Sequence, residues 1–554
     1  MYIPAMISGA KLHIAMQKML LPLFFMVLWT VSSGQLPVTI IVDSELLMKK
    51  DYRDSTTLFQ EIQALQVGWI NKGFYFTGID SVAANDDKEL TVFLHKGEKM
   101  KSETSGLNKK PLLRQIDRKL DYFGNSGFPF ATLRLDSLHT SNGDLTGLIK
   151  VDPGPEIKYD SATFSEDIKT NSTFVFQLLD IAPGALFSEK AYSTIGRKFD
   201  RSSFLTLNKP PDISFQKNKA TIYLDVSEDV SNSFQGIVGL QESSTGKSAI
   251  IGSLALDVEN LFQSGKQLSV HWERFAQESQ NLNLSYKHPF LLGMPLTPSV
   301  ELTILKQDTT FLTRGTKLGL LTYISPRTSL LIQYDGVNGS LISAKQENLV
   351  SKGLADFKRN SYEAILSNGL KRKLGQAKEG VFWKIGACIG TKKVTKNAAL
   401  SDAYYDSIAL STNFYRADLH LMGQKRIKKN LFFFQDVQGG ALENNEILTN
   451  ELYRLGGLST IRGFNEKTFF AKRFGMVRSE LRSFFESQSY AYLFFDQLIY
   501  QRARASEYVF GTGLGFVLAT LSGQFSFALS VGQSDNQQIS FNELRAHFGY
   551  VSRF

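Results

Sequence analysis

The pattern of apolar and polar positions changes once along the chain, near residue 230. Before that point, stripes of apolar residues at helical spacing alternate with segments of period two, a mixture that predicts small αβ units. After it the helical period is absent, and alternating segments of about ten residues follow one another between turn residues. The sequence therefore predicts a row of modules followed by one large β structure.

The first half repeats a similar arrangement three times. After Ser55, which can cap a helix, an apolar stripe of helical spacing runs until Gly73 can end it, and two alternating segments follow. A comparable order recurs after roughly 60–70 residues, a period that indicates a series of related modules. The expected modules are 35–99, a shortened 100–155, and 156–229. A generic αβ adaptor is the alternative interpretation.

The second half, 230–554, contains sixteen alternating segments. An even number of strands favours closure into a barrel, which removes the exposed edges that a sandwich would have to protect. In the twelfth segment Arg478, Glu480 and Arg482 share one face, whereas Leu481 lies on the other. Since an arginine facing lipid near the midplane costs roughly 2–4 kcal/mol, the charged face must line the lumen. The predicted fold is a transmembrane β-barrel of antiparallel strands.

The N-terminus has the form of a secretory signal, predicted to cover 1–34 so that the mature chain begins at Gln35. Positive residues precede the run "MLLPLFFMVLWTV", and small residues follow it. A membrane helix is the rival interpretation, but this run is shorter than the ~20 residues needed to cross a bilayer.

Composition and charge exclude several classes of function. Among 554 residues Cys388 is the only cysteine, which excludes intramolecular disulfides, cysteine-rich metal sites and an N-terminal lipoprotein anchor. The net charge of +9 is interspersed, without the clustered basic patch that nucleic acid binding needs. We find no metal-ligand spacing and no catalytic motif, so we expect no metal, no cofactor, no nucleic acid partner and no enzyme.

One loop is chemically unusual. The stretch "GGLSTIRGFNEK" lies in a long segment, 441–473, between the eleventh and twelfth predicted strands. An arginine shielded from water needs carboxylates within bidentate reach. The alternative is that Arg462 is exposed to solvent on an ordinary surface loop. Arg478 and Arg482 also share the face of Glu480 and are an alternative source of its neutralisation.

"IRGF", followed by "FGMVRSELR" and "LFFDQ", resembles the BamA/TamA family of outer-membrane assembly and translocation barrels, and "LDIAPGALFSEK" in the third module resembles a periplasmic POTRA domain of βααββ order. The resemblance covers the chain from about Ile157 to Phe554. It implies a sixteen-stranded barrel, preceded by two to three such modules, whose loop folds into the lumen and places its tip against wall acids of the twelfth and thirteenth strands. The residues it assigns are Ile461, Arg462, Gly463 and Phe464 for the tip, and Glu480 and Asp496 for the wall.

The resemblance also implies a lateral seam where the first and last strands pair poorly. Gly236 and Gly239 on the first strand, and Gly549 and the terminal Phe554 on the last, are the residues expected there. Glycines in strands weaken pairing, although tight packing explains small residues equally well.

The function implied is the insertion or translocation of other proteins at the outer membrane of a Gram-negative bacterium, with the modules in the periplasm. Expected partners are outer-membrane lipid, unfolded client proteins, and a periplasm-spanning or lipoprotein partner. Two alternatives stay open. One is a two-partner-type secretion channel or a passive pore, and the other is a surface antigen without clients.

Overall fold

A computed structural model describes most of the chain from Leu36 onward, together with Ile3 and Pro4. Within the described ranges no helix is both long and apolar enough to cross a membrane. The described residues form two compact units, one made of Met1–Thr163, Ile181–Thr194 and Pro211–Tyr223, the other of Phe164–Asp180, Ile195–Pro210 and Leu224–Phe554. The described ranges are 3–4, 36–52, 55–74, 77–84, 89–99, 101–103, 112–141, 144–164, 168–229, 231–242, 248–342, 353–369, 375–398, 400–406, 408–502, 505–520, 523–535 and 537–553.

The first module is a four-stranded sheet with one described helix. Its sheet has the order β3-β2-β5-β4, in which β2 and β5 run parallel. The apolar stripe of the helix packs on the sheet, with Leu58 and Ile62 fully buried against Val38 and Val92. The helix begins at Ser55, as predicted. The elements are β2 (Leu36–Val42), β3 (Glu45–Tyr52), α2 (Ser55–Asn71), β4 (Gly78–Ala84) and β5 (Leu90–His95).

The second module is smaller. One helix packs on its sheet through Ile116 and Leu133. The short strand β1 (Ile3–Pro4) pairs with β7; the rest of the predicted signal peptide, 1–34, lies outside the described residues. In each of the first two modules the structure describes one helix, at the predicted apolar stripe, together with a small sheet, an arrangement compatible with POTRA-like modules. The further elements are β6 (Lys101–Glu103), α3 (Leu112–Gly124), β7 (Thr132–Ser141) and β8 (Asp144–Asp152).

The third segment has the fuller helical content that the sequence indicates. Asn171 caps its first helix, accepting a hydrogen bond from the Thr173 backbone N–H at 2.8 Å, and Ser188 caps the second by accepting from the Ala191 N–H at 3.2 Å. Its strands form the sheet β11-β12-β9 and the pair β10-β13. The elements are β9 (Lys158–Phe164), α4 (Ser172–Leu179), α5 (Glu189–Ser193), α6 (Ile195–Phe199), β10 (Leu205–Leu207), β11 (Asp212–Gln216), β12 (Lys219–Leu224) and β13 (Val226–Glu228).

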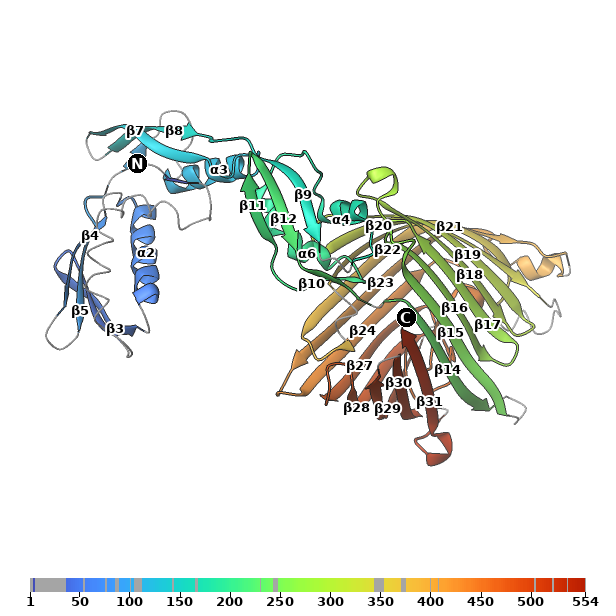
Figure 1. Cartoon of the computed structure of the whole chain (residues 1–554). Coiled ribbons are helices and arrows are strands. Elements are labelled where there is room, and N and C mark those ends of the chain that lie inside the picture. The colour runs from blue at the N-terminus through green and yellow to red at the C-terminus, as the bar shows by residue number, and fades with distance from the viewer. Residues whose placement is uncertain are drawn as a thin grey trace. The chain divides into compact units, whose positions relative to one another are not determined.

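A closed barrel of sixteen antiparallel strands follows, and it confirms the predicted fold and strand count (Figure 1). Each strand pairs with its neighbours in order, and the first pairs with the last. The strands are β14 (Ser233–Glu242), β15 (Ser248–Leu261), β16 (Lys266–Ala276), β17 (Ser279–Lys287), β18 (Thr297–Gln307), β19 (Phe311–Tyr323), β20 (Thr328–Leu341), β21 (Asp356–Gly369), β22 (Gly380–Thr395), β23 (Ser411–Arg426), β24 (Leu431–Glu443), β27 (Arg473–Phe484), β28 (Tyr490–Gln501), β29 (Ser506–Ala519), β30 (Gly523–Gln533) and β31 (Arg545–Arg553).

The outer wall of the barrel is apolar. On β18 the alternate residues Val300, Leu302 and Ile304 are all at least 40% exposed, and large exposed apolar residues also lie on every other barrel strand except β16. Glu480 and Arg482 on β27 are buried inside, whereas Leu481 between them is exposed, as predicted for that strand. A continuous apolar outer face is stable only against lipid, so this is a membrane-spanning barrel.

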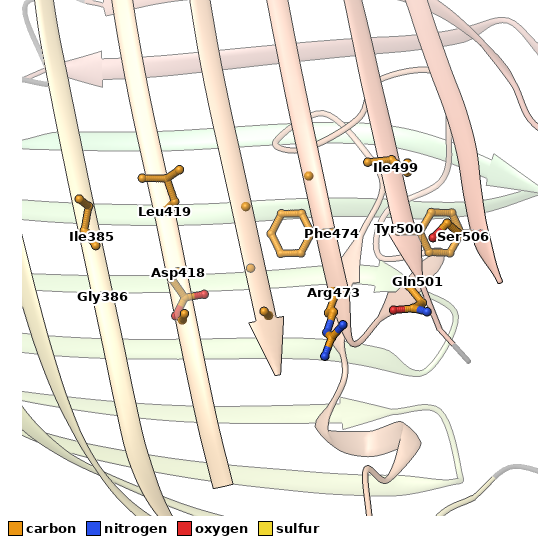
Figure 2. A pocket seen from close by; sticks show the side chains of 15 residues that line it. Ile385, Gly386, Asp418, Leu419, Arg473, Phe474, Ile499, Tyr500, Gln501 and Ser506 are labelled. Atoms are coloured by element: carbon orange, nitrogen blue, oxygen red, sulfur yellow. The ribbon is translucent and has the colours of Figure 1, made fainter. Parts of the chain in front are cut away.

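Small residues hollow one part of this wall. Gly439 of β24 lies opposite Gly475 of β27, and Ala441 and Ala417 are paired beside them. The hollow has a volume of about 640 Å³ and is bounded by larger side chains of β22, β23 and β28 (Figure 2).

Candidate functional site

The long loop between the eleventh and twelfth strands, residues 444–472, folds into the lumen. It contains the short helix η4 (Thr449–Glu451) and a two-stranded hairpin, β25 (Tyr453–Leu455) paired with β26 (Phe469–Ala471). Its apolar residues share one buried cluster with inward-facing residues of the wall. Members from the loop are Leu455, Ile461, Phe464, Phe469 and Ala471; members from the wall include Met476, Leu498, Tyr500 and Val509.

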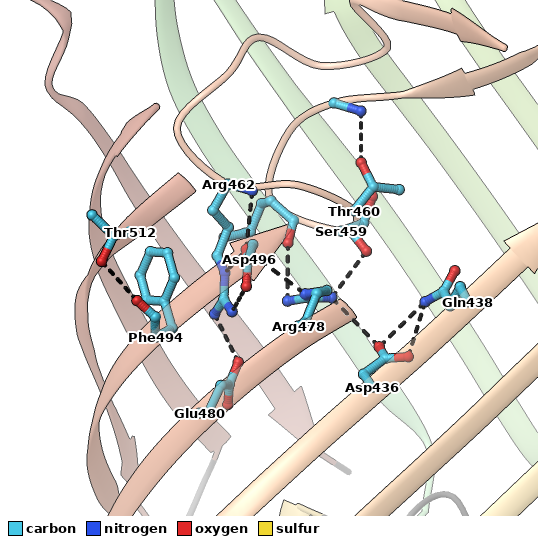
Figure 3. A network of polar contacts seen from close by, with 12 residues as sticks. Asp436, Gln438, Ser459, Thr460, Arg462, Arg478, Glu480, Phe494, Asp496 and Thr512 are labelled. Carbon is cyan, nitrogen blue, oxygen red and sulfur yellow. Dashed lines mark hydrogen bonds and ion pairs between the residues drawn. The ribbon is translucent and has the colours of Figure 1, made fainter. Parts of the chain in front are cut away.

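Arg462 is clamped by two wall acids (Figure 3). Its Nε and Nη2 donate to the two carboxylate oxygens of Asp496 on β28, both at 2.7 Å, and its Nη1 donates to Glu480 Oε1 on β27 at 2.7 Å. The Arg462 backbone N–H also donates to Asp496, at 3.2 Å. The arginine is 2% exposed and Asp496 is fully buried. The structure thus brings together the three residues that the sequence assigned to the clamp.

An aromatic ring completes the arginine's surroundings. The guanidinium carbon lies 3.7 Å from the centre of the Phe494 ring and 5.8 Å from that of Tyr492. Both rings come from β28, on the same inward face as Asp496. Stacking on a ring keeps the guanidinium plane available for edge-on hydrogen bonds, an arrangement that suits arginine better than lysine.

The wall acids are shared with two further arginines. Arg482 donates to Glu480 Oε2 from Nε at 2.8 Å, while Arg478 lies 4.0 Å from Asp496 and 3.7 Å from Asp436. Arg478 also donates to the carbonyl of Ser459 in the loop, at 3.0 Å. Glu480 is therefore neutralised by both the loop arginine Arg462 and the wall arginine Arg482. The sequence analysis treated these two partners as alternatives, and in the structure both are present.

Glycines allow the loop backbone to touch the wall. A Cβ added at Gly511 on β29 would lie 1.8 Å from the carbonyl oxygen of Arg462. Gly463 has a φ of +92°, and a Cβ there would meet the Val531 carbonyl oxygen at 2.4 Å. Phe464 lies beside Gly532 and packs edge-on against Phe469, with ring centres 4.9 Å apart. Glycine is thus required for close approach at these positions.

The predicted seam residues lie where the first and last strands meet. Gly236 faces Tyr550, and Gly549 faces Ile237. Gly239 pairs with Ile251 of β15, but the described pairing of β14 with β31 ends before it, at Val238. Phe554 lies outside the described residues.

The structure adds residues that the sequence reasoning missed. Tyr492 and Phe494 could have been identified from the sequence, because residues two and four positions before Asp496 on a strand share its face. No sequence signal revealed the other anchors of the loop. Lys392 of β22 is fully buried and pairs with Glu451 at 2.6 Å, and Tyr453 donates to Asp418 of β23 at 2.8 Å.

No protein-family model and no curated protein matches the sequence. Among solved structures the chain is similar to CdiB from Acinetobacter baumannii (12% identity, TM-score 0.54) and CdiB from Escherichia coli (14%, 0.53), each match covering 95% of this chain and 91% of the other. BamA from Haemophilus ducreyi lacking POTRA domains 1-3 has 14% identity and a TM-score of 0.44, over 82% of this chain and 95% of that one.

The two CdiB matches extend over the modules as well as the barrel. They show the fold, a sixteen-stranded β-barrel preceded by small POTRA-like modules, which the resemblance to the BamA/TamA family predicted. In such a barrel the short turns lie at the periplasmic end and the longer loops at the extracellular end. The loop that carries Arg462 lies at the end of the barrel that has the longer loops, and it is folded back into the lumen.

Proposed function

We propose that this protein inserts client proteins into the outer membrane, or passes them across it, at the seam between β14 and β31. It acts without an enzymatic step, and the folding of the client supplies the free energy. Its partners are membrane lipid, unfolded client chains and a periplasm-spanning or lipoprotein component. The small number of residue pairs between β14 and β31 supports insertion of clients over passive passage of solutes through the lumen.

The seam is the junction with the fewest residue pairs in the described barrel. Six residue pairs join β14 to β31, whereas other neighbouring strands are joined by eight to fourteen described pairs. Beyond Val238, the rest of β14 has no described pairing with the last strand. A strand edge with free N–H and C=O groups is a template for another strand, so a client strand can pair there as it enters the bilayer.

The modules supply a first contact for an extended client. In the first module β3 forms one edge of the sheet, and its residues Leu46 and Leu47 are exposed. An eight-residue edge of this kind can accept an added strand through its backbone groups. Capture at the modules followed by pairing at the seam gives a TamA-like order of events.

A dedicated export channel is the second candidate. Two cavities support it: one of about 520 Å³ beside the loop tip, and one of about 840 Å³ at the end of the barrel where β14 begins, lined also by residues 196–207. An export channel needs the loop to leave the lumen, whereas insertion at the seam does not. The anchors of the loop on several strands favour insertion.

Depletion of the protein followed by quantitative outer-membrane proteomics tests the proposal. We expect the levels of barrel proteins to fall, broadly for a general factor and for a few proteins for a dedicated one. Loss of one secreted protein with unchanged barrel proteins would support the export channel instead. Unchanged levels of both classes would refute any client-directed function.

A further inference from the structure

The tip of the inward-folded loop, residues 456–468, spans the seam from inside. Its backbone rests on Gly511 of β29 and Gly532 of β30, close to the last strand. On β31 itself, Arg545 donates from Nε to Asn465 Oδ1 at 3.0 Å and from Nη1 to the Gly463 carbonyl at 3.1 Å. These contacts join the tip to the last-strand side of the seam.

Lys467 extends to the other side. Its ammonium donates to the carboxylate of Glu273 on β16, the third strand, and lies 4.2 Å from the centre of the Phe275 ring on the same strand. Elsewhere on that side, a cavity of about 520 Å³ separates the tip from the inner faces of β14, β15 and β17. The tip therefore connects two walls that would have to separate when β14 leaves β31.

The two sides are held with unequal strength. Arg462 is buried and donates to two carboxylates, and buried pairs are costly to break. Lys467 and Glu273 form one ion pair with side-chain exposures of 19% and 27%. Because this pair is partly accessible to water and has a single lysine donor, it stabilises the closed seam far less than the Arg462 clamp stabilises the loop.

We propose that the Lys467–Glu273 pair is an inner latch of the seam, and that opening moves the first strands away from a fixed wall formed by β27–β31 and the loop tip. The role of the latch rests on the proposed function, because the latch regulates access of clients to the seam. It also explains how Arg462 can stay clamped while the barrel opens. Glu273 is opposite Ser253 of β15, and Ser253 is opposite Ile237 of β14, so the latch lies level with the end of the paired part of the seam.

Hydrogen exchange of the purified barrel in lipid nanodiscs tests the latch. In Lys467→Met, backbone amides of β14 and β31 should exchange about two- to five-fold faster, the factor expected from losing one partly exposed ion pair. The charge-swapped variant Lys467→Glu with Glu273→Lys should restore slow exchange. Heat-resistant migration on gels shows that each barrel is folded.

The matched control is Lys317→Met. Lys317 of β19 pairs with Glu301 of β18 at 3.1 Å, both 31% exposed, on strands away from the seam. It should leave exchange in β14 and β31 unchanged. Equal acceleration by the two variants, or wild-type exchange in Lys467→Met, would overturn the latch.

The effect of the latch on client proteins is measured in a separate experiment. A strain carrying Lys467→Met can be compared with wild type for its outer-membrane protein levels. Faster exchange at the seam with unchanged client levels upholds the latch and counts against insertion at the seam. The two proposals can therefore fail independently.

Discussion

At the scale of single residues, the clamp is a charge network and not a simple pair. Two arginines approach Glu480, and Asp496 is fully buried between Arg462 and the more distant Arg478. Each acid needs its partners because the lumen wall shields it from water. Arginine is required at the tip since a lysine cannot bridge two carboxylates while stacking on Phe494.

Arg462→Ala should destabilise the folded barrel by about 3–5 kcal/mol, because it leaves Asp496 buried without its bidentate partner. Lowered heat resistance on gels and faster proteolysis in residues 444–472 would report the loss. Arg473→Ala is the control, since Arg473 pairs with Glu443 at the surface with exposures of 53% and 59%, and should cost at most about 1 kcal/mol. Equal effects of the two variants would contradict the clamp.

At the scale of elements, strand β29 shows why "GTGLGF" contains three alternating glycines. All three face the lumen: Gly511 lies under the Arg462 carbonyl, and added Cβ atoms at Gly513 and Gly515 would meet Phe494 and Tyr492. The strand has no side chains at these three positions because the loop backbone and the aromatic rings of β28 occupy the space. Crowding in the lumen therefore explains the three glycines.

Gly511→Ala should displace the loop tip, since the new methyl group has no space beside the Arg462 carbonyl, and overpacking of this kind costs typically 1–3 kcal/mol. Gly475→Ala is a matched control: its Cβ would lie 3.6 Å from Ile499 Cγ2, an ordinary contact. Protease sensitivity of the loop should rise in the first variant only. If neither variant exposes the loop, the close contact does not hold the tip.

At the scale of the whole molecule, the barrel combines a short seam with a lumen braced by one loop. The loop is anchored on β22, β23, β27, β28 and β31, and on β16 through its tip. Our proposal of seam opening therefore places the movement at one junction and leaves the braced wall in place.

A disulfide across the seam should abolish client insertion. Gln235 and Val551 face each other there, and facing residues of antiparallel strands are close enough for a disulfide. In a Cys388→Ala background, the oxidised Gln235→Cys/Val551→Cys protein should fail to restore barrel-protein levels in depleted cells, and reduction should rescue it. Ser329→Cys/Ser367→Cys, between β20 and β21, should work in both states. Normal function of the oxidised seam variant would exclude insertion by seam opening.

The sequence by itself determined the class of fold, the number of strands and, on the twelfth strand, which side chains face the lumen. Period two carries that information locally, because successive residues of a strand face opposite sides. It placed Arg478, Glu480 and Arg482 in the lumen correctly, and the family resemblance indicated the acids that meet Arg462. The apolar stripe of the first module coincides with its described helix.

Only the tertiary structure decided which walls the loop touches. Lys467 and Glu273 are separated by 194 positions, and Lys392 and Glu451 by 59. Local periodicity gives the direction of a side chain but not the distance between two distant segments, which depends on barrel closure and the path of the loop. The clamp was therefore predictable from a motif and its strands, whereas the latch and the other anchors exist only once the barrel has closed around the loop.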